Sequence, residues 1–507
     1  MAVNNNSSSF DKVPFETNAA VSPANIKKFF VTPAEGEEGI DLTGAVAQFY
    51  FYESVLSNYV EATVEIMDSG FIMNSDGSLG LQPGGILSGS KNIQPIIGGS
   101  RIDFDIEDNK FSNKVNNLGS GNRLDNLKMD DGMYVSRIRD ISTSTLKNYF
   151  AIDLVSKEAF NNELTRVTKR YDGNIGESVK KILKDVLGVD QQNIEIEDTL
   201  LDYNFIGNDR KPFNVCTSLA SKSVPLPVSE RPTLNRRAGF LFFQTRLGMH
   251  FISVANRVIG DKKPGRTYRI GNVINTKKGR SYDFSVKSFG STSSKQINPQ
   301  QFDDLILDYS VNNQIDVQKD LNLGTYNNRT LFFDFYSMSY VVRDFDVIED
   351  IFETDTTSRK NIIQSINRGE TPEQFKNLPL RGLTKTPSRL MSHVLDVGTL
   401  PAGTNSEQQL KAWKNSPTSA TFKASETMVQ SIMGYNSLFR QKLNITIAGD
   451  FSMVAGNYIQ CVFQAVGSSE DDDKNLTGFY MISDVCHRVT PTETFTSMDL
   501  VPLNKII

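Results

Sequence analysis

The strongest constraint on the fold is a strict alternation of apolar and polar residues. From Tyr59 to Ile66, each even-numbered position is apolar and each odd-numbered one is Tyr, Thr or Glu. A period of two places the apolar side chains on one face of a β-strand. The same alternation returns near both chain ends, at Ile102, Phe104 and Ile106 and again from Asn444 to Ala448. The chain is therefore predicted to be mainly β, with one buried face per strand.

Helical periodicity interrupts this β texture in the middle of the chain. Apolar residues at spacings of three and four predict an amphipathic helix that ends before Gly188, and a second helix begins near Pro212. Residues 238–254 read as a hairpin with Leu247 and Gly248 in its turn. A further stripe, Met428, Ile432, Tyr435 and Phe439, predicts one more helix before the last strands.

The 507 residues are enough for about three or four domains. The predicted segment boundaries lie where the hydrophobic periodicity or the composition of the sequence changes. The segments are a flexible N-terminal arm (1–24), a first β unit read as a small barrel or sandwich (25–158), an intermediate α+β domain (159–310), the first part of a second β unit (311–349), a loop-rich insertion (350–420), and a helix with the remainder of the second β unit (421–507).

Charge and cysteine content exclude several functional classes. The net charge is −5, without the basic excess expected of a dedicated nucleic-acid binder. Three scattered cysteines provide neither a disulfide framework nor a zinc site. The N-terminus lacks the apolar region of a secretory signal, and no apolar run is long enough to span a membrane.

Motifs that carry catalysis or bind cofactors are absent from the sequence. The three histidines, His250, His393 and His487, are far apart, and no zinc-protease, P-loop or nucleophile-elbow motif occurs. The acidic runs "MDDG" and "SEDDDK" lack the alternating spacing of a calcium loop, so solvated turns are favoured over metal sites. We therefore predict no catalytic, cofactor-binding or metal-binding residues, and no enzymatic activity.

The stretch "NITIAGDFSMVAGNYIQCVF", Asn444–Phe463, could be a ligand loop or a corner of the fold. It lacks the following helix and the lysine that a phosphate site needs. We interpret it as a corner, with glycines placed for backbone geometry and an Asp that bonds its own backbone. The predicted structural turn residues are Gly70, Gly449, Asp450, Gly456 and Asn457.

The order of these elements resembles the baseplate hub protein of contractile-tailed, T-even-like phages. That family is similar to the hub part of type VI secretion spike proteins and to late-control tail proteins. The resemblance rests on residues 131–162, 173–188, 205–253 and 440–503, in the family's order. It departs from the family at Ala455, where a Pro is common, and in the 350–420 insertion, which has no counterpart.

The resemblance implies two small tube-like β-barrels per chain and a homotrimer whose six barrels make a pseudo-sixfold ring. Such a hub would join the tail tube protein to a separate central spike protein, contact neighbouring baseplate proteins, and leave a channel for DNA in transit. It would be located in the virion baseplate after assembly in the host bacterial cytoplasm. Residues 1–24 and 350–420 are the expected contacts to neighbouring baseplate proteins.

Two alternatives stay open at this point. One is another barrel-containing baseplate or tail-tube-related protein. The other is a peptidoglycan-degrading tail enzyme, since any two of the 59 acidic residues could meet in the fold.

Overall fold

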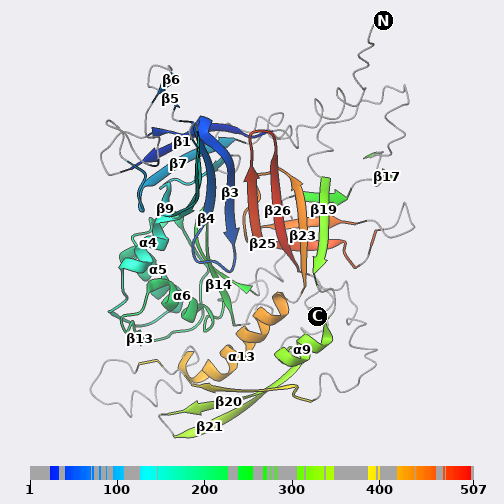
Figure 1. The fold of residues 1–507 in the computed structure, drawn as a ribbon. Coiled ribbons are helices and arrows are strands. Elements are labelled where there is room, and N and C mark those ends of the chain that lie inside the picture. The colour runs from blue at the N-terminus through cyan, green and yellow to red at the C-terminus, as the bar shows by residue number, and fades with distance from the viewer. Residues whose placement is uncertain are drawn as a thin grey trace, which may run out of the picture.

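The computed structural model describes most of the chain in two β-rich regions with helices beneath them (Figure 1). The described residues are 23–33, 40–69, 71–73, 79–81, 87, 95–107, 126–144, 147–226, 238–254, 266–270, 274–275, 280–281, 305–312, 316–335, 338–346, 386–395, 398–399, 420–439, 441–463, 472–473 and 475–503. Gly70, most of the predicted arm and most of the predicted insertion lie outside these ranges.

One large sheet of 14 strands contains both β regions. The strands of its N-terminal set enclose one core. The apolar even-numbered residues of the Tyr59–Ile66 stretch point into this core, together with Phe29, Phe49 and Phe104. The set comprises β1 (Asn25–Thr32), β2 (Ile40–Asp41), β3 (Val46–Ser54), β4 (Glu61–Asp68), β7 (Arg101–Glu107), β8 (Asn126–Lys128), β9 (Met133–Thr143) and β10 (Asn148–Val155).

The C-terminal set of the same sheet encloses a second core around Ile445, Met481 and Leu500. It comprises β16 (Arg266–Ile270), β19 (Leu305–Asn312), β23 (Lys442–Ala448), β24 (Tyr458–Val462), β25 (Gly478–Val489) and β26 (Thr494–Pro502). These strands pair in the order β25-β24-β16-β19-β23-β26, and β26 returns to pair with β25.

The two sets are joined by antiparallel pairing of β3 with β25, from Ser54 opposite Asp484 to Phe49 opposite Val489. The predicted mainly-β class is confirmed, but the described strands of the two expected tube-like barrels belong to one large sheet. The N-terminal set stays open between β2 and β3, because β3 uses its second edge to pair with β25.

The two sets contain the same five-strand arrangement. The order β7-β9-β10-β4-β3 in the first set corresponds to β24-β25-β26-β23-β19 in the second, with every neighbouring pair antiparallel. The sequence Asp153-Leu154-Val155 in β10 matches Asp499-Leu500-Val501 in β26. This correspondence makes Asp153 equivalent to Asp499, and the strand registers then pair each residue of one set with its equivalent in the other.

Two of the irregularities in the strand pairing fall at the same places in both sets. The β9–β10 register shifts between Asp153 and Leu154, and the β25–β26 register shifts opposite Asp499 and Leu500. The β3–β4 register shifts between Val46 and Gln48, and the β19–β23 register shifts at the equivalent Ile306 and Asp308. Because bulges are specific features of a strand pair, their coincidence identifies the two sets as an internal structural repeat.

The intermediate unit holds three short helices against a small sheet. Asn174 caps α5 by accepting hydrogen bonds from the backbone N–H groups of Gly176 and Glu177, and the apolar stripe of α5 faces a third core. The elements are α4 (Lys157–Leu164), α5 (Ile175–Asp185), α6 (Pro212–Ala220), η3 (Gln191–Asn193), β11 (Arg170–Tyr171), β12 (Ile194–Ile196), β13 (Phe205–Ile206), β14 (Phe240–Thr245) and β15 (Gly248–Ser253).

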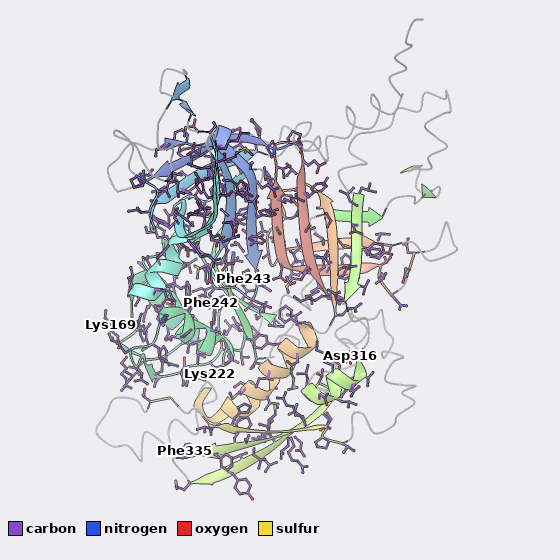
Figure 2. The ribbon with its side chains drawn as sticks, viewed as in Figure 1. Lys169, Lys222, Phe242, Phe243, Asp316 and Phe335 are labelled. Atoms are coloured by element: carbon purple, nitrogen blue, oxygen red, sulfur yellow. The ribbon has the colours of Figure 1, made fainter. Side chains whose placement is uncertain are left out.

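Strand β14 is buried on both faces, because it lies between two cores. Phe240 and Phe242 pack into the core of the intermediate unit, whereas Leu241 and Phe243 pack into the C-terminal core. Phe242 and Phe243 are labelled at this boundary in Figure 2. The predicted hairpin at Leu247 and Gly248 is therefore also the element that connects two units.

A separate three-stranded sheet lies below the large one (Figure 1). It consists of β20 (Asn327–Asp334), β21 (Ser339–Asp346) and β22 (Arg389–Val394), and it packs on α9 (Val317–Leu323) and α13 (Ala420–Leu438). Residues 311–349 were expected to begin the second β unit. Instead, Phe332 packs with Val429 and Met433 of α13, which holds β20 and β21 in their own sheet.

Short elements complete the described chain: η2 (Thr43–Ala45), β5 (Phe71–Met73), β6 (Leu79–Leu81), β17 (Ile274–Asn275) and β18 (Arg280–Ser281). Among the described residues, no helix is long and apolar enough to cross a membrane.

Candidate functional site

The turn between β14 and β15 carries Arg246 into a junction of three units. The Arg246 side chain is buried, and its guanidinium donates to the backbone carbonyls of Asn126 (3.1 Å), in the N-terminal set, and Phe451, in the C-terminal set. A planar cation with several donors suits this task, since it can satisfy carbonyl groups from two directions. The intermediate unit is thereby bonded to both halves of the large sheet.

Glu53 of β3 supplies the negative charge at the same junction. Its carboxylate accepts from the backbone N–H groups of Arg246 (2.7 Å) and Ala455 (3.2 Å). Burial raises the pKa of Glu53, and the nearby Arg246 charge and these two backbone donors oppose that shift. Glu53 thus ties the first β unit to the other two through backbone groups.

His487 of β25 lies beside this junction and is almost fully buried. Its Nε2 lies 3.1 Å from the Met453 carbonyl, which can only accept, so Nε2 carries the proton and donates. Its Nδ1 then accepts from the Thr496 hydroxyl at 3.0 Å. Burial first, and the Arg246 charge second, lower the pKa of His487 to about 3. The imidazole is therefore neutral and acts as a fixed hydrogen-bonding group.

We expect this buried imidazole to make the fold acid-sensitive. Between about pH 6.5 and pH 3 the unfolded chain binds a proton at His487 that the folded chain does not, so stability falls as pH is lowered. The slope from this one group reaches at most about 1.4 kcal/mol per pH unit. His487→Gln keeps a donor for Met453 and removes the titration. Urea midpoints at neutral and mildly acidic pH should differ less in the variant; an identical difference in both proteins contradicts the assignment.

The predicted corner residues lie around this junction. Gly449 lies too close to Thr494 for any side chain, because an added Cβ would be 2.4 Å from Cγ2 of Thr494. The Gly449 N–H donates to the Thr494 carbonyl at 2.8 Å, which holds the two residues together. Asp450 is fully buried, and its Oδ1 accepts from the Ser452 backbone at 3.0 Å.

The second turn of the corner uses a left-handed glycine. Gly456 has a φ of +85° and its N–H donates to the Ile482 carbonyl at 2.8 Å, while the Asn457 carbonyl accepts from Ile482 N–H at 2.9 Å. Gly99 and Ser100 make the same pair of bonds to Val135 in the N-terminal set, and Gly99 has a φ of +87°. The corner therefore belongs to the internal repeat.

A hydroxyl–imidazole–carboxylate series stabilises the β14–β15 hairpin. The Thr245 hydroxyl lies 2.8 Å from Nε2 of His250, and Nδ1 of His250 lies 2.7 Å from a carboxylate oxygen of Glu195. Nucleophilic hydrolases use these groups in this order. Here Thr245 has no exposed surface and also accepts from the Leu247 N–H, so its oxygen is not available to a substrate. The sequence interpretation missed this series because Glu195 is distant along the chain.

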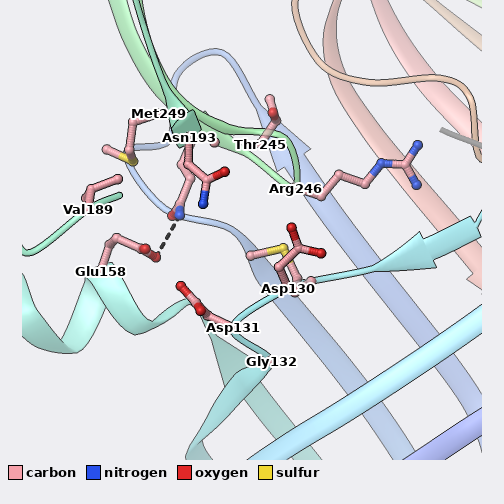
Figure 3. Close-up of a pocket in the computed structure, with 12 residues that line it drawn as sticks. Asp130, Asp131, Gly132, Glu158, Val189, Asn193, Thr245, Arg246 and Met249 are labelled. Carbon is pink, nitrogen blue, oxygen red and sulfur yellow. Dashed lines mark hydrogen bonds between the residues drawn. The ribbon is translucent and has the colours of Figure 1, made fainter. Parts of the chain in front are cut away.

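A small cavity of ≈ 30 Å³ lies between the β8–β9 turn, α4 and the β14–β15 hairpin (Figure 3). Glu158 accepts from the Gln244 amide at 2.7 Å, whereas the Arg246 side chain points away from Glu158. This volume suits a water molecule rather than an organic ligand. No group of His, Cys, Asp or Glu among the described residues has the arrangement of a metal site.

The structures that this chain resembles are phage tail proteins and a type VI secretion component. A tail protein from Neisseria meningitidis MC58 aligns with a TM-score of 0.45 and 8% identity, over 94% of this chain and 96% of that one. The 43 kDa tail protein of prophage MuSo2 from Shewanella oneidensis aligns with a TM-score of 0.45 and 7% identity, over 95% and 99%. The E. coli c3393 protein, a component of the type VI secretion system, aligns with a TM-score of 0.37 and 9% identity, over 94% and 76%.

No protein-family model and no curated protein matches the sequence. Because the structural similarities combine identities below 10% with TM-scores below 0.5, they do not transfer a function to this chain.

Proposed function

We propose that this chain is a structural, non-enzymatic virion protein: the central baseplate hub of a contractile phage tail. The observation that supports this proposal most directly is the internal repeat joined by β3–β25 pairing. A chain with two equivalent β units presents six such units when three copies assemble. The same ring can then meet a sixfold tail tube on one side and a threefold spike on the other.

The buried polar groups support a structural role. Glu53, Arg246 and His487 come from different parts of the chain, and each is bonded to groups of another unit or strand. Bonds of this kind resist relative movement of the units, as a part that transmits force during sheath contraction requires.

Charges on the large sheet are paired on the face opposite the cores. Arg137 and Arg139 both bond Asp153, and Lys442 lies 3.3 Å from Asp484. We assign this face to the channel, where balanced charge would hold DNA phosphates only weakly and leave DNA free to pass. A channel lined mainly by unpaired basic side chains would contradict this assignment.

The oligomeric state tests the proposed function. Light scattering at micromolar concentration should give three times the mass of one chain for the protein alone, or three copies of this chain plus the bound spike when the spike protein of the same particle is added. A monomer under both conditions overturns the hub proposal. Electron microscopy of the tail tip then distinguishes a hub on the axis from a peripheral baseplate protein of related fold.

A further inference from the structure

Within one chain, the pairing of β3 with β25 joins the two repeated β units at one edge of each. The equivalent edge of β9, and that of β19, lacks such a partner strand among the described residues. In the described chain, β25 pairs with β24 near its start and with β3 from Asp484 onward. Its equivalent, β9, pairs with β7 only at Met133 and Tyr134, and no described strand pairs with that edge beyond Val135. The position that β3 occupies beside β25 is therefore open beside β9.

The equivalent of β3 has a matching open edge. Strand β3 uses one edge for β4 and the other for β25, whereas β19 uses one edge for β23 and pairs with β16 only at Leu305 and Ile306. Among the described strands, none pairs with that edge of β19 from Asp308 to Asn312. An open edge on each unit is a site for strand addition.

Apolar residues on these two edges are exposed although their positions are core positions in the repeat. Ile141 lies at a register shift opposite the buried Phe150 and corresponds to the buried His487, yet it is 56% exposed. Asp140, with a φ of 56°, is the extra residue of this bulge. Tyr309 corresponds to the fully buried Phe49 and is 39% exposed.

We propose that β19 of one copy pairs antiparallel with β9 of the next copy, as β3 pairs with β25 within the chain. The occupant of each open edge is thus a second copy of this chain. Within the chain, Phe51 lies opposite His487, and the equivalent contact between copies places Val311 opposite Ile141. In the same way, the internal pair of Tyr50 and Arg488 corresponds to Ser310 opposite Ser142 between copies. The joint is head-to-tail, and a rotation of one third of a turn between copies closes such a joint into a trimeric ring. The inference rests on the proposed trimeric hub and identifies its contact surface.

Paired cysteines test this register. Ser142→Cys with Ser310→Cys, in a Cys486→Ser background, should give disulfide-linked dimers and trimers on oxidation with diamide, because directly opposed residues lie within disulfide range. Tyr50→Cys with Arg488→Cys is the matched control, since this equivalent pair lies within one chain and its disulfide leaves the monomer mass unchanged. Each single interface variant should give no trimer band.

A charge on the edge provides an independent test. Ile141→Asp should abolish the trimer in light scattering while leaving the melting temperature of the monomer unchanged, because the side chain is exposed within one chain. Leu164→Asp, at an exposed apolar position on α4, should leave the trimer intact. Two results overturn this interface but not the hub. One is a trimer in which the Ser142→Cys, Ser310→Cys variant forms no cross-link between copies, and the other is a trimer that survives Ile141→Asp. A monomer under all conditions overturns both.

Discussion

Replacing Arg246 with methionine is expected to cost about 3–5 kcal/mol of folding free energy, because it breaks a buried charge arrangement by removing one side only. Arg246→Met leaves the Glu53 carboxylate buried with two backbone donors but without its compensating charge. It also removes the guanidinium donors to the carbonyls of Asn126 and Phe451. Unmet buried acceptors add their own desolvation cost.

A double-mutant cycle separates the charge effect from lost packing. Glu53→Gln alone should also destabilise the protein, because it leaves Arg246 without a counter-charge. The double variant should be more stable than the sum of the two single effects predicts, because neither charge is then left buried without its partner. Urea denaturation of the four proteins measures the coupling directly. Arg329→Met is the matched control, because Arg329 makes its ion pair with Asp344 on an exposed surface.

Two results would contradict this account of the junction. One is an Arg246→Met protein as stable as the Arg329→Met control. The other is strict additivity in the cycle, which would mean that Glu53 and Arg246 act independently. The change should also weaken the attachment of the intermediate unit, so limited proteolysis should cut the variant between units at lower protease concentration.

Local periodicity was sufficient to predict the elements that form this junction, but not the junction itself. The alternation from Tyr59 to Ile66 lies mostly in β4, and the predicted hairpin exists, although its turn is formed by Arg246 and Leu247, and Gly248 already belongs to β15. Nothing near Arg246 in the sequence marks it as buried, since its partners Glu53 and Phe451 are about 200 residues away on either side. Contacts of that range depend on how the units pack, and a single sequence does not encode them locally.

The internal repeat left a weak trace in the sequence. "DLV" recurs at Asp153 and Asp499, and Ser136 and Ser483 occupy the same place at the equivalent bulges. Such short matches gain meaning only with the strand registers known. For β20 and β21, the aromatic-rich sequence correctly predicts strands but does not indicate which sheet they join. Their sheet depends on the packing of Phe332 against α13.

Replacing Gly456 with valine is expected to damage folding and assembly through two effects. The φ of +85° strains any L-residue, and a β-branched one most, by about 1–2 kcal/mol or more. An added Cβ would also lie 3.0 Å from Cζ of Phe243, and valine's methyl groups extend further into that buried ring. Overpacking of this kind costs about 1–3 kcal/mol.

Gly99→Val separates these two effects, because the repeat provides the same backbone geometry without the crowding. Gly99 has a φ of +87° and makes the equivalent bonds, but an added Cβ there meets no atom within 4 Å. Gly99→Val should therefore show the strain alone, and Gly456→Val should lose more stability in urea denaturation and form less trimer. Phe243→Leu should recover part of the difference at Gly456 and none at Gly99. If Gly456→Val folds and assembles normally, the corner is not set by backbone geometry; if both valine variants lose equal stability, Phe243 does not limit the space at this corner.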